Sequence, residues 1–312
     1  MTDRYVRVSR ETSFGVTGTV HHFLNAVSET FALERDDYVD DETLAAFPSV
    51  FAPGNMRVTG SLTTHLQAVG AVPRILAALF GSFPAPTGTG PYTYTITPKD
   101  IPASLTIRSA LVPDISKAKE MLGMVPTAAT LTLDATEARP QLEVEFVGRE
   151  LGLVAPDATV VFPSDRFFHT RDVTVTLGGA PFRPRSLELV IERAIDEDHY
   201  VLDGTGKLAG ILPTGKFSVH GSIEIPLQMA ESEYLDFLNA AAKGELVVRL
   251  SYDTGAAERT LQFRIPRWYY QNPSVEVSGR EAIILAADFV AIHDGTNPYV
   301  ELKIINNEGT LD

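Results

Sequence analysis

Most of this chain alternates apolar and polar residues with a period of two, in short runs separated by turn residues. Asn55–Leu66 and Ser186–Glu192 are clear examples. Because successive side chains of a strand point to opposite faces, this pattern is typical of half-buried strands. Val72–Phe80, with Pro73 in its first turn, and Glu231–Ala242, with an acidic start, instead predict short helices. The sequence therefore predicts a mainly β protein with antiparallel strands.

The two halves of the chain share one order of elements, which indicates a tandem repeat. Ser28–Arg35 (SETFALER) aligns with Ser186–Arg193 (SLELVIER), and Gly54–Leu62 (GNMRVTGSL) aligns with Gly215–Ile223 (GKFSVHGSI). A strand, a helix and a strand follow in both halves, so we predict two β-barrel or sandwich domains, each with one short helix and one long projecting loop. The predicted boundaries are 1–27 for an N-terminal arm, 28–155 for the first domain and 156–312 for the second, which ends with the C-terminal strand.

Composition excludes several classes of function. The chain has no cysteine, which excludes disulfides, thiolate metal sites and a cysteine nucleophile. With 26 basic and 40 acidic side chains, its net charge of -14 opposes non-specific binding to nucleic acid. The N-terminal stretch MTDRYVRVSRETSFG is charged where a signal peptide is apolar, and no apolar run reaches the roughly 18 residues of a membrane span. We expect a protein of an aqueous compartment with no membrane partner.

Motifs for catalysis or cofactor binding fail on inspection. Gly210–Phe217 resembles a phosphate-binding loop, but Phe217 replaces the required hydroxyl and a strand pattern follows. The histidines lack metal-ligand spacing, the acidic runs lack the EF-hand pattern, and there is no GxSxG motif. We therefore predict no catalytic residues, no cofactor and no metal site. A hydrolase using two carboxylates from distant strands is an alternative that sequence leaves open.

Both halves carry a long insertion at the same place, Asp36–Pro53 and Ala194–Thr214. Connections longer than about 12–15 residues are uncommon and are usually functional. These loops hold apolar side chains that need a surface to cover them, and the simplest such surface is another copy of the same protein. The candidate assembly residues are Asp36, Asp37, Tyr38, Asp40, Asp41, Phe47, Phe51, Asp196, Asp198, Tyr200, Leu208 and Ile211.

The first half resembles the tail tube proteins of long-tailed bacteriophages and related viruses. The resemblance rests on RYVRVSRETSFG at the start, on SETFALER, on RVTGSLTTHL running into VPRILAALFGS, and on TLTLDATEARPQLEVEFVG. It covers nearly all of residues 1–150, and the repeat extends it more loosely to the second half. Many tail tube subunits have one barrel, whereas this chain is predicted to have two.

The resemblance implies a structural virion protein and not an enzyme. It implies a major tail tube subunit that self-assembles into stacked rings, through which viral DNA is ejected. Three two-barrel subunits would supply the six barrels of a ring, which predicts a homotrimer with pseudo-hexameric symmetry, stacked through the projecting loops. The implied partners are further copies of the chain and other tail proteins, such as the tape measure and the tail terminator, with DNA as passing cargo. The implied location is the virion tail, after assembly in the host cytoplasm.

A second interpretation is a baseplate or binding module of a virion with two barrels. In that case Trp268, Tyr269 and Tyr270 would form an aromatic platform for carbohydrate or for another protein. Self-association distinguishes the two interpretations, because a tube protein should form rings or filaments at raised concentration, whereas monodisperse monomers that bind sugar would favour the binding module.

Overall fold

A computed structural model describes residues 4–39, 51–110, 117–226, 238–239, 242–276 and 284–312. Within them, strands dominate and one α-helix is present, α1 (Ala71–Phe80). The strands pair antiparallel in two large sheets, which confirms the predicted mainly antiparallel β architecture. Helix α1 confirms the helix predicted over Val72–Phe80, whereas the helix expected over Glu231–Ala242 lies almost entirely outside the described residues.

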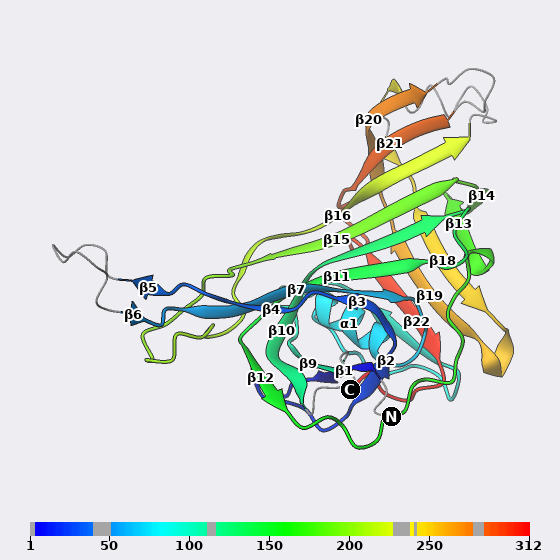
Figure 1. Ribbon diagram of the computed structural model, residues 1–312. Helices are drawn as coiled ribbons and strands as arrows, with labels where there is room; N and C mark the ends of the chain where they lie inside the picture. The colour runs from blue at the N-terminus through cyan, green and yellow to red at the C-terminus, as the bar shows by residue number, and fades with distance from the viewer. Residues whose placement is uncertain (1–3, 40–50, 111–116, 227–237, 240–241, 277–283) are drawn as a thin grey trace.

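The larger sheet has 14 strands, and its path runs the length of the molecule (Figure 1). In spatial order the path is β17 (Ala242–Lys243), β20 (Trp268–Glu276), β21 (Ile284–Ala291), β16 (Pro213–Pro226), β15 (Ser186–Ile195), β10 (Ala118–Asp134), β11 (Gln141–Gly148), β7 (Met56–His65) and β3 (Ala26–Glu29). The other strands of this sheet are β4 (Ala32–Arg35) beside β7, β9 (Leu105–Ala110) and β12 (Glu150–Val154) beside β10, and β1 (Tyr5–Arg10) between β9 and β2 (His22–Leu24).

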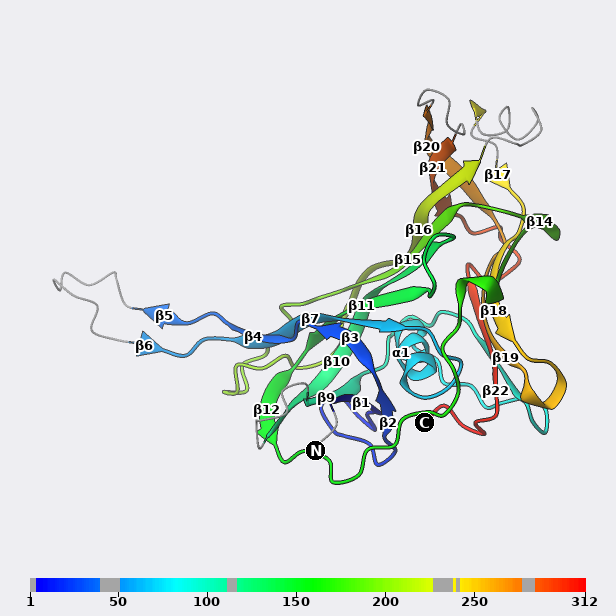
Figure 2. The ribbon, with the colours of Figure 1, turned by 45° about the vertical axis from the view of Figure 1, so that its right-hand side comes forward.

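A second sheet of six strands packs across the first (Figure 2). Its order is β14 (Ala180–Phe182), β13 (Val173–Leu177), β18 (Leu246–Tyr252), β19 (Arg259–Ile265), β22 (Glu301–Asn306) and β8 (Tyr92–Ile96). A separate pair is formed by β5 (Tyr38–Val39) and β6 (Phe51–Ala52), and the short helical turns are η1 (Thr170–Asp172) and η2 (Gly255–Ala257).

Strands from the two halves share both sheets. In the larger sheet, residues 128–134 of β10 pair with residues 186–192 of β15. In the smaller sheet, the C-terminal strand β22 lies between β19 and β8, and β8 comes from the first half. Strand β1, from the segment predicted as an N-terminal arm, is buried and pairs with β2 and β9. The described residues of both halves are therefore built into one folded body.

The strand registers repeat between the halves. Leu33 of β4 lies opposite Val58 of β7, and Ile191 of β15 lies opposite Val219 of β16. The alignment of SETFALER with SLELVIER places Leu33 over Ile191, and the alignment of GNMRVTGSL with GKFSVHGSI places Val58 over Val219. The last pair of strands matches as well, because β10 and β20 each have a bulge where they pair with β11 and β21. Each half thus contributes four strands in one order, β4–β7–β11–β10 and β15–β16–β21–β20.

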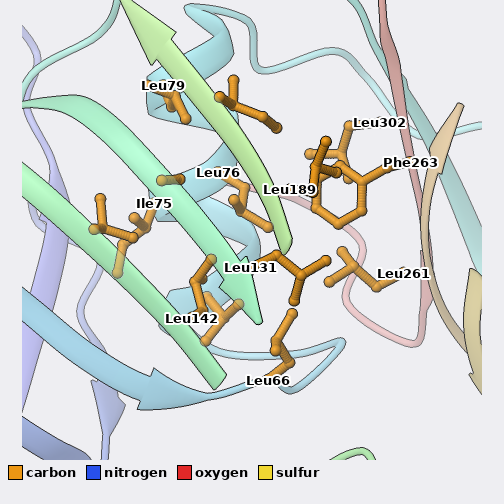
Figure 3. Packing of buried hydrophobic residues seen from close by; sticks show 14 of the residues in the cluster. Leu66, Ile75, Leu76, Leu79, Leu131, Leu142, Leu189, Leu261, Phe263 and Leu302 are labelled. Atoms are coloured by element: carbon orange, nitrogen blue, oxygen red, sulfur yellow. The ribbon is translucent and has the colours of Figure 1, made fainter. Parts of the chain in front are cut away.

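Helix α1 fills the space between the two sheets. Its side chains Ile75, Leu76 and Leu79 are buried against leucines of the larger sheet and apolar residues of the smaller one (Figure 3). The helix ends at Gly81, which has a φ of 70° and donates its N–H to Ala78 O. A Cβ there would lie 2.1 Å from Ile101 O, so the position requires glycine.

The buried Arg74 of α1 ties the end of the chain to the helix. Its guanidinium donates to Gly70 O at 2.9 Å and to Thr310 O at 2.8 Å, and it forms an ion pair with Glu308. Asn306 adds a hydrogen bond from Nδ2 to Ala68 O at 2.7 Å. Because a buried cation is tolerated only when it is paired, these contacts fix the C-terminal residues against the first half.

The junction between the halves should contribute strongly to stability. Leu189 of β15 is fully buried opposite Leu131, so Leu189→Ala should lower the free energy of unfolding by about 2–5 kcal/mol. Val190, on the other face of the same strand, is only half-buried, and Val190→Ala should cost below about 1 kcal/mol. Urea denaturation followed by tryptophan fluorescence measures both, and equal losses for the two variants would contradict this assignment of the core.

Candidate assembly surfaces

The first arm, Asp36–Pro53, projects from the end of the larger sheet (Figure 1). Its base is closed by a hydrogen bond from Asp36 N–H to Asn55 O at 2.9 Å. Tyr38 is 48% exposed and Phe51 is 59% exposed, so both offer apolar surface. Hydrogen bonding to Arg35 lowers the pKa of the Asp37 carboxyl. The other predicted residues of this arm lie outside the described residues, namely Asp40, Asp41 and Phe47.

The second arm, Ala194–Thr214, projects from the turn between β15 and β16 in the same direction (Figure 1). Its base repeats that of the first arm, with Asp196 N–H donating to Leu212 O at 2.8 Å. Tyr200 is half-buried, which raises its pKa, and Leu208 opposite it is buried within its own chain. Ile211 is also half-buried. Val201 and Leu202 are the most exposed large apolar side chains of the second arm, and the sequence analysis did not predict them as assembly residues.

The second arm packs on the strands from which the first arm leaves. Met56 N–H of β7 donates to Gly206 O at 2.7 Å. Arg57 of β7 donates from Nη1 to Asp198 Oδ1 of the second arm and from Nε to Glu34 Oε2 of β4, both at 2.9 Å. Lys207 of the second arm also forms an ion pair with Glu150 of β12. These contacts fix the second arm beside the base of the first.

The larger sheet has an open edge at each end of its path. Strands β3 and β4 pair with β7 on one side only, and β20 pairs with β17 only at Trp268 and Tyr269, as far as the described residues extend. Open edges expose unpaired N–H and C=O groups, which favour pairing with another strand. Leu33 on β4 is 43% exposed, whereas its counterpart Ile191, which lies opposite Ala129 of β10 and belongs to the core, is 2% exposed. Sequence reasoning expected open edges but did not locate them.

One face of the larger sheet is acidic. It is the face opposite the core, and its strand segments 59–65, 128–134, 141–147, 186–192, 218–224 and 284–290 contain no lysine or arginine. Threonine and serine are the most frequent of the remaining side chains on this face, together with alanine, valine, isoleucine, glutamine and histidine. The acidic side chains that register and burial place there are Asp134, Glu143, Glu145, Glu188, Glu192, Glu224 and Asp288.

The aromatic cluster belongs to the core. Trp268 and Tyr270 are buried, and their ring centroids lie 4.7 Å apart in an edge-to-face arrangement. Trp268 also packs against Phe289 at 5.6 Å. Tyr269, between them on the strand, is half-buried. Two of the three rings of the predicted aromatic platform are therefore in the core.

Comparison with known proteins agrees with the resemblance found in the sequence. A family model described as phage tail tube protein matches residues 2–291. The chain belongs to this family. It is therefore a tail tube protein, a structural component of the virion tail, and membership implies a structural rather than an enzymatic role. No curated protein gives a significant match. Within the part of the chain that the structure describes, no helix is long and apolar enough to cross a membrane.

The contact between the second arm and β7 can be tested by hydrogen exchange. Arg57→Ala removes the bonds to Glu34 and Asp198, so amide exchange in residues 196–208 should accelerate by about threefold, as expected for a partly exposed ion pair. Arg35→Ala is the matched control, because Arg35 pairs with Asp37 inside the first arm. Mass spectrometry measures the amide exchange of residues 196–208 in both variants. Equal acceleration in the two variants would contradict a contact between Arg57 and the second arm.

Proposed function

We propose that this protein is the major tail tube subunit, that three copies form a ring with pseudo-hexameric symmetry, and that rings stack into the conduit for viral DNA. The observation that carries the proposal is the β10–β15 junction. It joins the last strand of one half to the first strand of the next, in an antiparallel register over seven residues, Ala128–Asp134 with Ser186–Glu192.

The two open edges are the counterparts of the strands at that junction. Strand β20 corresponds to β10, and β4 corresponds to β15, so β20 of one copy can pair with β4 of the next in the same way. Such a contact is heterologous, and six similar units close a ring when each is turned by about 60° from the previous one. Three copies of this chain supply six units.

The exposed apolar surface at the edge supports this arrangement. At the internal junction, Ile191 lies opposite Ala129 of β10 and is buried, whereas Leu33 at the corresponding place on the open edge is exposed. Pairing with β20 of a neighbour would cover Leu33, and burial of apolar area stabilises association. It would also satisfy the free backbone groups of both strands.

The acidic face suits the wall of a channel for DNA. Carboxylates repel phosphates, and the six strand segments of this face offer no cation to retain them. DNA would pass as cargo without specific binding. This is the face that points away from the core, so it stays free when the sheet is extended from copy to copy.

The remaining parts of the proposal concern stacking, partners and boundaries. The two arms, which leave the body in one direction, contact the next ring. Other tail proteins, such as the tape measure and the tail terminator, are the further partners, and assembly takes place in the host cytoplasm. We keep the division into an N-terminal segment 1–27 and repeats 28–155 and 156–312 as part of the proposal.

Disulfide trapping tests the ring. Thr130 pairs with Val190 at the junction, and the repeat registers give Ser274 and Ala32 as their counterparts. Because the chain lacks cysteine, a variant carrying Ser274→Cys and Ala32→Cys has no native thiol that competes for the bridge, and peptide mapping distinguishes the 32–274 bridge from symmetric ones. Under oxidation it should give cross-linked dimers and trimers on non-reducing gels, and circular trimers should be the final product.

The control variant combines Ser274→Cys with Leu33→Cys. A shift by one residue moves the side chain to the other face of the strand, so this variant should cross-link at least about tenfold less. Equal cross-linking of the two variants, or none in either, would contradict the edge pairing. Covalent products that continue beyond the trimer would contradict the trimeric ring.

A further inference from the structure

A cleft opens between the two sheets at the end of the molecule remote from the arms. It has a volume of about 630 Å³ and lies between the ends of β10 and β15 and the edge formed by β13 and β14. Its lining includes the apolar side chains Leu133, Val175, Phe182 and Leu187. Arg183 and Arg185 also line it and are exposed.

Neither of these arginines forms an ion pair within 4.0 Å with any residue in the described ranges. The acidic residue in the lining, Asp134, accepts hydrogen bonds at its Oδ1 from Thr136 N–H and Oγ1, both at 2.7 Å. These hydrogen bonds are the main cause that lowers the pKa of Asp134, and the charge of Arg185 adds a smaller contribution. An apolar cleft with unpaired cations suits a segment that combines apolar and acidic side chains.

The first arm has this composition. Its stretch 36–51, DDYVDDETLAAFPSVF, contains acidic residues and no lysine or arginine, and Tyr38 and Phe51 are exposed on its described part. The second arm is a poorer match, because it contains Lys207 and buries Leu208 within its own chain.

The positions of arm and cleft also agree with stacking. Both views show β5 and β6 at one extreme of the molecule and β13 and β14 at the other (Figure 1, Figure 2). When identical rings stack in one direction, the arms of one ring face the cleft end of the next.

We propose that the cleft lined by Arg183 and Arg185 receives the first arm of a second copy of this chain, in the adjacent ring. The inference rests on the proposed function, because it needs stacked rings. It adds a binding site on the receiving subunit: the apolar floor covers the aromatic side chains of the arm, and the two arginines pair with its carboxylates.

Charge reversal separates this inference from ring formation. The variant Arg183→Glu with Arg185→Glu should still form rings, but the protein concentration needed for tubes should rise at least about tenfold, as for a loss of about 1.4 kcal/mol per contact. Adding Asp40→Lys and Asp41→Lys on the arm should restore tubes. Arg267→Glu is the control, since Arg267 is exposed and lies outside the cleft. Negative-stain images count rings and tubes, and circular dichroism checks that each variant is folded.

Each outcome bears on a different claim. Tubes of unchanged length in the Arg183→Glu, Arg185→Glu variant would overturn the cleft assignment and leave the proposed function intact, with another segment or another tail protein as the occupant. If the Arg183→Glu, Arg185→Glu variant loses tubes and adding Asp40→Lys and Asp41→Lys does not restore them, the pairing of arm and cleft is overturned. Absence of rings in the unmodified protein would overturn the proposed function together with this inference.

Discussion

The antiparallel pairing of β10 with β15 is the interaction on which the rest of the structure depends. It places β15, at the edge of the four strands from the second half, beside β10, at the edge of the four strands from the first half, so that one sheet carries both. The same pairing brings Leu131 and Leu189 over α1 and the second sheet, and it aligns the two arms at one end. It also decides which two edges remain open.

Much of this organisation could be predicted from the sequence, because alternation and the repeated SETFALER and SLELVIER patterns are local signals. They gave the strands, the first helix and the positions of both arms. They could not give the pairing partners, because strands of similar alternation look alike and their contacts are far apart in sequence. The sequence also could not predict which side chains of the arms are buried. Leu208 is buried and Leu202 is exposed, although both are leucines of the second arm.

The two halves use the same residues in different surroundings. Arg193 is buried, donates to Asp100 O at 2.9 Å, and burial lowers its pKa to about 10. Its counterpart Arg35 is exposed, and a hydrogen bond to Asp37 raises its pKa. The Arg-containing motif of the second half therefore contributes to the interior, where Arg193 also donates to Phe80 O at the end of α1, whereas that of the first half lies on the surface.

The place of β22 in the second sheet has a consequence for biosynthesis. β22 follows all the other described strands in the sequence, yet it lies between β19 and β8 and brings Glu308 to Arg74. During synthesis, β8 therefore has no partner in its sheet until β22 has left the ribosome, because β22 is its neighbour among the described strands. A polypeptide truncated before β22 would leave β8 unpaired.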